Sequence, residues 1–371
     1  MLEKKRYYDI DWLRVLGMFT IFLFHNARFF NEEDWHVKNY ELDFGMSVFV
    51  EILVHFIMPL FFVLSAIAIY YALKKRTNSE FMRERVIRLL IPLGIGMFTH
   101  IMLQVYIERI THGEFTGSFW QFIPHYFNGW YAFGGNFAWM GLHLWYLMML
   151  FIFSWLMLSV FRSINSSQNF ITKLANLISK LLGPYLFIIP LFLMEFLVSF
   201  SPETVGRRDF GGWSPFTYLV FFLIGYLLAT NERYRPAIEK VRFISLGLSL
   251  LTVFGAYILL VEMGASRLAP LYLLVRATNA WSWLLTFLGF ASRHLQFKNS
   301  FLEYANEAVL PFYILHQTVI VVIGYFIRDW QWAIMPKYLF LAGTSFVIIL
   351  SLYEFLVKRI NILRYLFGMK G

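Results

Sequence analysis

The chain contains no cysteine, and only 15% of its 371 residues are charged. The absence of cysteine excludes disulfides, a thiolate nucleophile, and metal or iron–sulfur sites built from cysteine ligands. A Gly-rich phosphate loop ending in Lys-Ser/Thr, a zinc-binding HExxH helix and a GxSxG nucleophile turn are also missing. The sequence therefore predicts no metal site and no bound cofactor, and it gives no support for nucleotide hydrolysis through a phosphate loop.

Hydrophobic residues, in contrast, make up 59% of the chain and aromatic residues 20%, whereas soluble domains have roughly 45–50% apolar residues. Apolar runs close to the roughly 20 residues that a membrane-crossing helix needs cover residues 11–30, 48–73, 86–106, 143–161, 184–200, 213–229, 243–262, 268–290, 305–327 and 336–357. No linker or repeat interrupts them. We expect an all-α, polytopic membrane protein with about ten transmembrane helices in a single bundle, formed by one domain over residues 1–371.

Lysine and arginine residues are unevenly distributed among the connections, with 22 on one side of the predicted bundle and 8 on the other. Because positively charged connections concentrate on the cytoplasmic side, both termini are expected in the cytoplasm. The same bias accounts for most of the net charge of +9. The sequence therefore predicts the lipid bilayer as a partner and no nucleic acid.

The first apolar run carries two residues that are unusual at membrane depth, Arg14 and His25. A central arginine costs roughly 2.5–3.5 kcal/mol on insertion scales, so such residues usually face a bundle interior or a water-filled cavity. Residues eleven apart on a helix are rotated by only roughly 20° and lie roughly 16 Å apart along the axis. One face of the helix thus carries a cation at one end and an imidazole at the other, which suits a long ligand with an anionic head and a reactive tip.

Two arginines at the start of the third run form a second pattern. Arg85 and Arg88 are three residues apart and are therefore neighbours on one helix face. Two guanidinium groups presented together can bind a phosphate in a bidentate manner. The alternative is ordinary anchoring on the cytoplasmic side, which a lone pair of arginines also provides.

Titratable residues near the opposite surface form a third group. His25 is expected at a depth comparable to that of Glu51 and His55, which are four residues apart on one helix face, and His143 belongs to the same layer. A carboxylate beside an imidazole raises its basicity and fixes its tautomer, as general-base catalysis requires. The alternative is that each histidine is a hydrogen-bonded packing group.

The late runs add Arg276, Asn279 one turn after it, and His316 halfway along its run. A fixed cation such as Arg276 at that depth needs a partner, which can be a substrate carboxylate, a protein carboxylate or a cluster of carbonyl groups. The sequence leaves these three alternatives open. A long loop at 107–142 is rich in Trp, Tyr, Phe, Gly and Asn, which fits either a binding element or an interfacial aromatic belt.

At this point the chain resembles the acyltransferase family 3 membrane O-acyltransferases over nearly its whole length. The shared patterns are Arg14 and His25 separated by ten residues, Arg-x-x-Arg at Arg85 and Arg88, HLW from His143 to Trp145, RATNAWSW from Arg276, and NEAVLPFYILHQT from Asn306 to Thr318. The segment EDWHV at 33–37 and the tail LYEFLVKRINILRYLFG resemble the branch that modifies periplasmic glucans with succinyl groups.

The resemblance implies a ten-helix enzyme of the cell (inner) membrane that moves an acetyl or succinyl group from cytoplasmic acyl-CoA to a hydroxyl of an extracytoplasmic glycan or similar acceptor. The phosphates of CoA would lie near Arg85 and Arg88, with Arg14 just inside. His25 would act as general base or carry the acyl group as a nucleophile; we prefer the base, which needs one intermediate fewer. From the expected depths, and not from the resemblance, Glu51 or a neighbouring group is expected to hold the His25 ring.

Other polar or aromatic residues of the shared patterns are predicted to bind the substrates. These are His143, Trp145, Arg276, Asn279 and His316.

A secondary transporter or a glycan or lipid exporter without acyl transfer is the alternative from another class. Transporters often show internal repeats and broken helices paired between their halves. Neither is evident here, because Pro59 is the main helix breaker of the first half and has no obvious counterpart in the second. A non-catalytic scaffold would leave Arg14 and Arg276 without a reason. The enzyme is therefore the preferred interpretation.

Overall fold

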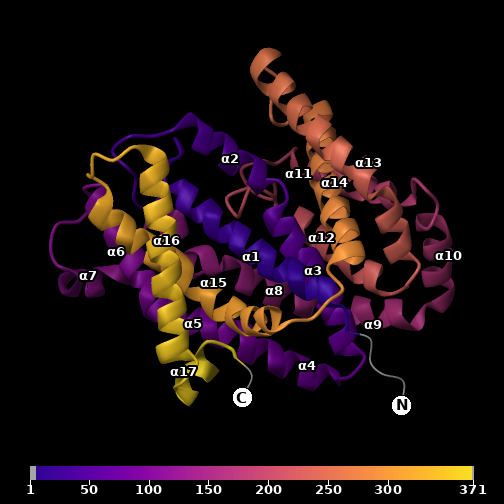
Figure 1. Ribbon diagram of the computed structural model, residues 1–371, viewed down its shortest axis with the longest axis horizontal. Helices are drawn as coiled ribbons and strands as arrows, with labels where there is room; N and C mark the ends of the chain where they lie inside the picture. The colour runs from indigo at the N-terminus through magenta and orange to yellow at the C-terminus, as the bar shows by residue number, and fades with distance from the viewer. Residues whose placement is uncertain (1–5, 370–371) are drawn as a thin grey trace. The chain divides into compact units, whose positions relative to one another are not determined.

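The computed structural model describes residues 6–369, which form helices joined by turns and loops (Figure 1). Within these residues no strand is formed, and β-pairing is limited to an isolated bridge between Trp130 and Phe137. The all-α class predicted from the sequence is confirmed. Several of the predicted spans are bent or broken.

The α-helices are α1 (Tyr8–Arg28), α2 (Phe44–Val54), α3 (Ile57–Leu73), α4 (Asn78–Arg85), α5 (Ile91–Phe98), α6 (His100–Thr111), α7 (Phe119–Tyr126), α8 (Trp145–Leu156), α9 (Leu158–Ser166), α10 (Gln168–Ile178), α11 (Ile188–Val198), α12 (Pro215–Ala229), α13 (Tyr234–Tyr257), α14 (Pro270–His294), α15 (Ser300–Ile327), α16 (Ile334–Leu352) and α17 (Asn361–Leu366). The 3₁₀ segments are η2 (Tyr131–Phe133), η3 (Leu142–Leu144) and η4 (Gly183–Phe187). The π-helical segments are η1 (Val86–Leu90), η5 (Ile258–Glu262) and η6 (Tyr353–Val357).

Membrane-crossing helices are recognised by their length and apolar composition. Among the described residues four helical stretches meet both conditions, Phe44–Leu73, Tyr234–Glu262, Ser300–Ile327 and Ile334–Val357, and three bent helix pairs raise the number to seven if each pair is one span. Helices α1 and α14 are long enough but carry polar and charged residues, and α12 is apolar but shorter. The prediction of a multi-pass protein is thus supported, but among the described residues four to seven candidate crossings are found and not ten.

The chain divides into two compact units. Unit 1 comprises Met1–Gly17, Ile52–Phe81 and Phe153–Glu303, and unit 2 comprises Met18–Glu51, Met82–Ile152 and Tyr304–Gly371. Each unit is described by itself. The expectation of one domain over 1–371 stays a prediction.

Unit 1 is built on two close helix pairs, α13 against α14 and α12 against α3 (Figure 1). Gly225 allows the second pair to approach, because a Cβ atom there would lie 2.5 Å from the carbonyl oxygen of Val63. Helix α3 starts after a break at His55. Pro59, which has no N–H, cannot bond to the carbonyl of His55, and the indole Nε1 of Trp213 donates to that carbonyl instead, at 3.2 Å.

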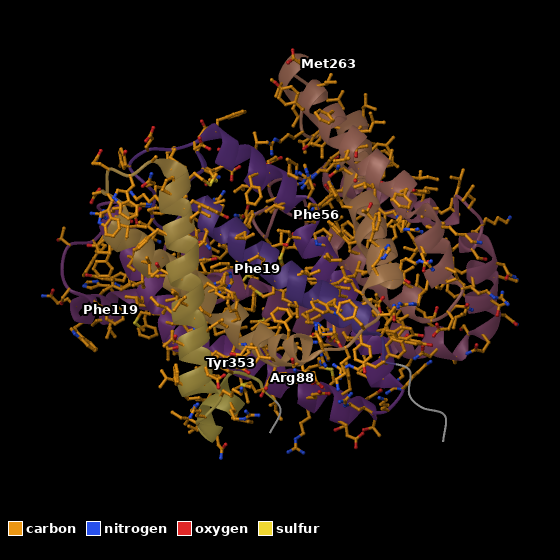
Figure 2. All side chains as sticks on the ribbon, in the orientation of Figure 1. Phe19, Phe56, Arg88, Phe119, Met263 and Tyr353 are labelled. Atoms are coloured by element: carbon orange, nitrogen blue, oxygen red, sulfur yellow. The ribbon has the colours of Figure 1, made fainter. Side chains whose placement is uncertain are left out.

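Unit 2 has an aromatic core in which Phe22 of α1 packs against Phe312 of α15, with ring centroids 5.4 Å apart. Side chains fill the space between its helices (Figure 2). Two lysines hold its loops. The ammonium of Lys38 donates to the carbonyls of Arg28 and Glu33 and to the amide oxygen of Asn31, at 2.6, 3.0 and 2.9 Å.

The second lysine, Lys337, is fully buried. Its ammonium donates to the amide oxygen of Asn39 and to the carbonyls of Arg328 and Trp330, the latter two at 3.0 and 2.8 Å. An ammonium group has three N–H donors, so each lysine has an acceptor for every donor. The loop between α1 and α2 is therefore held at both ends by buried or half-buried lysine side chains.

Candidate active site

Four histidines of unit 2 come together from separate elements, and we refer to them as the histidine cluster: His25 of α1, His100 of α6, His143 of η3 and His316 of α15. The ring centroids of His25 and His316 are 4.8 Å apart, those of His316 and His143 5.0 Å, and those of His143 and His100 6.3 Å. Three of the four are site residues predicted from the sequence. The structure thus groups predicted residues that lie up to 291 positions apart.

His143 is placed by an unusual turn. Gly141 has a φ of +72° and Leu142 a φ of +49°, a conformation that side-chain-bearing residues rarely adopt and that often marks functional sites. After this turn the Nε2 of His143 donates to the carbonyl of Ile314 at 3.1 Å, and the hydroxyl of Tyr313 donates to the carbonyl of His143. These two bonds fix His143 on the helix that carries His316.

The hydrogen bonds within the cluster determine which ring nitrogens carry a proton. The Nδ1 of His316 lies 2.6 Å from the carbonyl oxygen of Tyr313 and must therefore be the donor, which leaves Nε2 of the neutral ring as an acceptor. The Nδ1 of His25 lies 3.1 Å from that Nε2 and 3.0 Å from the carbonyl oxygen of Ile21. Both are acceptors, so Nδ1 of His25 carries the hydrogen and its Nε2 keeps the lone pair that a base or nucleophile uses.

Exposure separates the members of the cluster. His316 is fully buried and His143 nearly so, whereas His25 and His100 are half-buried. Among the pair that shares a hydrogen bond, His25 is the more exposed residue and His316 is the acceptor. The Nδ1 of His143 and the Nε2 of His100 are buried atoms with no hydrogen-bond partner among the described residues.

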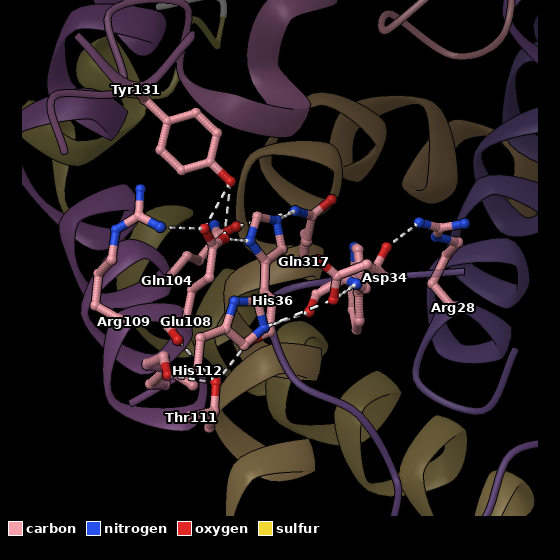
Figure 3. A network of polar contacts seen from close by, with 12 residues as sticks. Arg28, Asp34, His36, Gln104, Glu108, Arg109, Thr111, His112, Tyr131 and Gln317 are labelled. Atoms are coloured by element: carbon pink, nitrogen blue, oxygen red, sulfur yellow. Dashed lines mark hydrogen bonds and ion pairs between the residues drawn. The ribbon is translucent and has the colours of Figure 1, made fainter. Parts of the chain in front are cut away.

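A second polar network surrounds the buried carboxylate of Glu108 (Figure 3). It is contacted by the Nδ1 of His36, by the hydroxyl of Tyr131 at 2.8 and 2.9 Å, and by a guanidinium nitrogen of Arg109 at 3.2 Å. Burial and the Glu108 carboxylate raise the pKa of Tyr131 well above its ordinary value of 10. Tyr131 therefore keeps its proton and remains a donor to Glu108.

This network extends to the histidine cluster. The side-chain amide of Gln317 contacts Nε2 of His36 at 2.9 Å and donates to the amide oxygen of Gln104 at 3.0 Å. Gln104 in turn donates to the hydroxyl of Thr318, which lies 2.8 Å from Nδ1 of His100. A continuous chain of hydrogen bonds thus links Glu108 to the cluster. Sequence reasoning missed it, although the i,i+4 pair of Gln104 and Glu108 beside an apolar run was a signal.

The other predicted catalytic residue, Glu51, lies in α2. The hydrogen bonds that the structure shows for the His25 ring go to His316 and Ile21. An imidazole thus contacts Nδ1 of His25 where a carboxylate was expected, and a role for Glu51 stays a prediction. Trp145, half-buried at the start of α8, also keeps its predicted role untested.

The predicted phosphate-binding arginines lie where an α-helix changes its form. Arg85 ends α4, and Arg88 lies in the π-helical segment η1 (Arg88 is labelled in Figure 2). The guanidinium of Arg88 is 3.6 Å from the carboxylate of Glu84 and donates to the carbonyl of Gly368 at 3.3 Å. In unit 1, Arg14 pairs with Asp11 at 3.1 Å. Phosphate binding by these arginines stays a prediction.

Arg276 of unit 1 obtains the partner that the sequence left open. Its guanidinium pairs with the fully buried carboxylate of Glu195 at 3.3 Å, donates to the carbonyl of Gly212 and lies 4.0 Å from the ring centre of Trp213. Arg208 pairs with the same carboxylate at 3.0 Å. The partner set is thus a protein carboxylate and a carbonyl, with one negative charge shared by two arginines.

Asn279 of unit 1 is buried one turn after Arg276. Its side-chain amide donates to the carbonyl of Ser249 at 2.8 Å and to the hydroxyl of Thr252 at 2.9 Å. These bonds join α14 to α13, so the structure gives Asn279 a packing contact, and its predicted substrate contact stays untested. Within residues 6–369, no three His, Asp or Glu side chains are arranged to hold a metal ion.

Comparison with known proteins adds to this geometry. The family model described as an acyltransferase domain, acyltransferase family 3, matches residues 7–354. The chain belongs to this family. It is therefore an acyltransferase, and its apolar helices make it a multi-pass membrane protein. The resemblance seen in Arg14, His25 and the Arg85 to Arg88 pattern is confirmed as membership.

Curated relatives extend over nearly the whole chain. "Glucans biosynthesis protein C" of Escherichia coli O139:H28 is 24% identical, with 99% of this chain and 95% of the relative covered. The proteins of the same name from Shigella dysenteriae serotype 1 and Escherichia coli K12 are each 25% identical with the same coverage. No solved structure matches the chain.

Proposed function

We propose that this protein transfers an acetyl or succinyl group from acyl-CoA to a hydroxyl of a glucan or similar glycan. Family membership supports acyl transfer, and the name shared by the relatives supports a glucan as acceptor. The observation that carries the proposal is the hydrogen bond from His25 to His316, because it leaves a lone pair on Nε2 of a partly exposed imidazole.

In the proposed reaction, Nε2 of His25 removes the proton of the acceptor hydroxyl while its oxygen attacks the thioester carbonyl. The carbon–sulfur bond breaks, and the thiolate of CoA takes the proton from the His25 imidazolium, so atoms and charges balance. His316 accepts the hydrogen bond from Nδ1 of His25 and stabilises the imidazolium as it forms. Direct transfer is preferred to an acyl-imidazole on His25 because it needs one intermediate fewer.

The direction of transfer follows from a proposed topology. The four single helices and three bent pairs, together with α1, α12 and α14, correspond one to one with the ten apolar runs of the sequence. Ten crossings with both termini in the cytoplasm agree with the 22 to 8 distribution of lysine and arginine. The proposed membrane is the inner membrane, with the donor entering from the cytoplasm and the acceptor from the opposite side.

Several residues are assigned to the substrates within this proposal. Arg85 and Arg88 bind the phosphates of CoA, and Arg14 also contacts the donor. His143 contacts the substrates near His25. Its buried Nδ1 has no hydrogen-bond partner among the described residues and is available for this contact. Arg276 favours an anionic acyl group such as succinyl, because Arg208 and Arg276 share one carboxylate and leave one excess positive charge.

The test uses the purified protein in detergent with acetyl-CoA or succinyl-CoA and a glucan, and it measures release of free CoA and acylation of the glucan. His25→Ala should bind acyl-CoA as the wild type does and lose roughly 10²–10⁴-fold in transfer, as for a lost general base. Arg276→Gln should lower succinyl transfer more than acetyl transfer. Wild-type transfer by His25→Ala, or solute flux in liposomes without CoA turnover, would contradict the proposal.

A further inference from the structure

The loop between α1 and α2 places an indole beside the base. In unit 2 the ring centroid of Trp35 lies 6.4 Å from that of His25, with 32° between the ring planes. Both side chains are half-buried, so both present surface to a bound molecule. The position of Trp35 next to the one ring nitrogen assigned to proton removal makes it a candidate for acceptor binding.

The backbone around Trp35 is fixed from several sides. The Nε2 of His112 contacts the carbonyl of Trp35 at 3.3 Å, and a guanidinium nitrogen of Arg28 donates to the carbonyl of Asp34 at 2.6 Å. These residues are labelled with the network in Figure 3, except for Trp35 itself. Carbonyl groups of two successive residues are therefore held by side chains of α1 and of the segment after α6.

His36, the residue after Trp35, holds the backbone of the loop through several contacts. The ring of His36 is buried and contacts Glu108 and Gln317, while its carbonyl accepts from the hydroxyl of Thr111 at 3.0 Å. The next residue, Val37, is also buried. The indole of Trp35 thus projects from a backbone that is fixed before and after it, and its distance from His25 is set before any ligand binds.

Carboxylates lie next to this indole in the sequence. The side chains of Asp34 and Glu33 are 85% and 59% exposed. An aromatic face beside planar polar groups is suited to a pyranose, whose C–H face is apolar and whose rim carries hydroxyl groups. Glu33 pairs with the guanidinium of Arg28, whereas the more exposed Asp34 carboxylate disfavours phosphate at this place.

We propose that Trp35 is the binding surface for a pyranose ring of the acceptor. The indole face packs against the C–H face of the sugar, and Asp34 and Glu33 accept hydrogen bonds from its hydroxyls. The ring is thereby positioned so that one hydroxyl lies at Nε2 of His25. This inference rests on the proposed acyl transfer and names the residue that recognises the acceptor.

The experiment compares two acceptors with the same acyl-CoA donor, a short linear glucose oligosaccharide and glycerol, which has hydroxyls but no ring. Trp35→Ala should raise the KM for the oligosaccharide at least about tenfold more than the KM for glycerol, because only the pyranose loses a stacking surface. Trp35→Phe should restore most of the affinity. The matched control is Trp332→Ala, which removes a 46% exposed indole whose ring is tilted against Trp330 and edge-on to Phe340.

Equal changes in KM for both acceptors, or no change, would overturn the inference, since a merely structural role of Trp35 affects both acceptors alike. Binding of the oligosaccharide is also measured without donor, by saturation-transfer NMR in detergent. Binding that is at least about tenfold weaker in Trp35→Ala than in the wild type supports the surface, and unchanged binding contradicts it. Absence of CoA release from the wild type with any acceptor would instead contradict the proposed function, and the NMR result would still decide on Trp35.

Discussion

At the scale of single residues, the proposed reaction depends on the hydrogen bond between the imidazoles of His25 and His316. His316 holds His25 through one hydrogen bond, and the carbonyl of Tyr313 holds His316 in the tautomer that can accept it. The carbonyl of Ile21 offers the same Nδ1 hydrogen of His25 a second acceptor. Loss of His316 should therefore impair orientation of the base without abolishing it.

This difference can be measured with His316→Ala. We expect kcat to fall roughly tenfold or more, but by less than the roughly 10²–10⁴-fold loss of His25→Ala, while the KM values for donor and acceptor change little. His316→Gln should recover part of kcat, because its amide oxygen can accept from Nδ1 of His25. The control is His125→Ala, which removes an exposed histidine of the same unit.

An increase in both KM values with unchanged kcat would contradict the orienting role of His316. A His316→Gln enzyme no faster than His316→Ala would also count against it, because the acceptor atom would then be irrelevant.

The residues also show how far the sequence could lead. His25 and His143 were expected in one layer because helix length fixes depth. The contact between His25 and His316 could not be predicted, since it depends on the rotation of α1 and α15 about their axes. Likewise, the depth of Arg276 showed that it needs a partner, but only the fold brings Glu195 to it.

At the scale of the elements, hydropathy predicted the helices of the third apolar run but not the bend between them. The apolar residues of this run predict a helix, and helices form there, but α5 and α6 meet at a bend of 43°. At that bend the hydroxyl of Thr99 donates to the carbonyl of Ile95 at 2.6 Å, a bond that competes with the helical backbone pattern. Hydropathy measures apolar length and carries no information about direction.

At the start of the same run, Arg85 and Arg88 lie at the junction of α4 and η1. A π-helical segment often marks a functional site. Replacing both arginines by alanine should weaken acyl-CoA binding, with each charge-assisted bond worth roughly 1.5–3 kcal/mol. Lysine at both positions should restore only part of the affinity for acyl-CoA, because its ammonium lacks the planar, bidentate geometry of a guanidinium. Binding is measured by titration calorimetry in detergent.

The control for this pair is Arg83→Ala, an exposed arginine of α4. It should leave the affinity for acyl-CoA unchanged. If the Arg85 and Arg88 double variant also binds acyl-CoA like the wild type, the two arginines serve only as anchors at the membrane surface.

At the scale of the whole molecule, the testable quantity is the number and direction of the membrane crossings. Reporter fusions after Asn39 and after Lys75 should give signals on opposite sides, because the connection that contains Lys75 carries many positive charges and the one that contains Asn39 carries few. Matched fusions after Arg162 and Arg233 should report the same side as Lys75. Signals on one side from Asn39 and Lys75 would refute the proposed ten-crossing topology.

The loop that carries Trp35 is held by the ammonium of Lys38, and its far end by that of Lys337. In other proteins a bound calcium ion can hold a loop in the same way, because it binds backbone carbonyl and side-chain amide oxygens. Here the donors are lysine side chains, which are covalently part of the chain. The groups that hold the backbone beside the indole are consequently supplied by the chain itself.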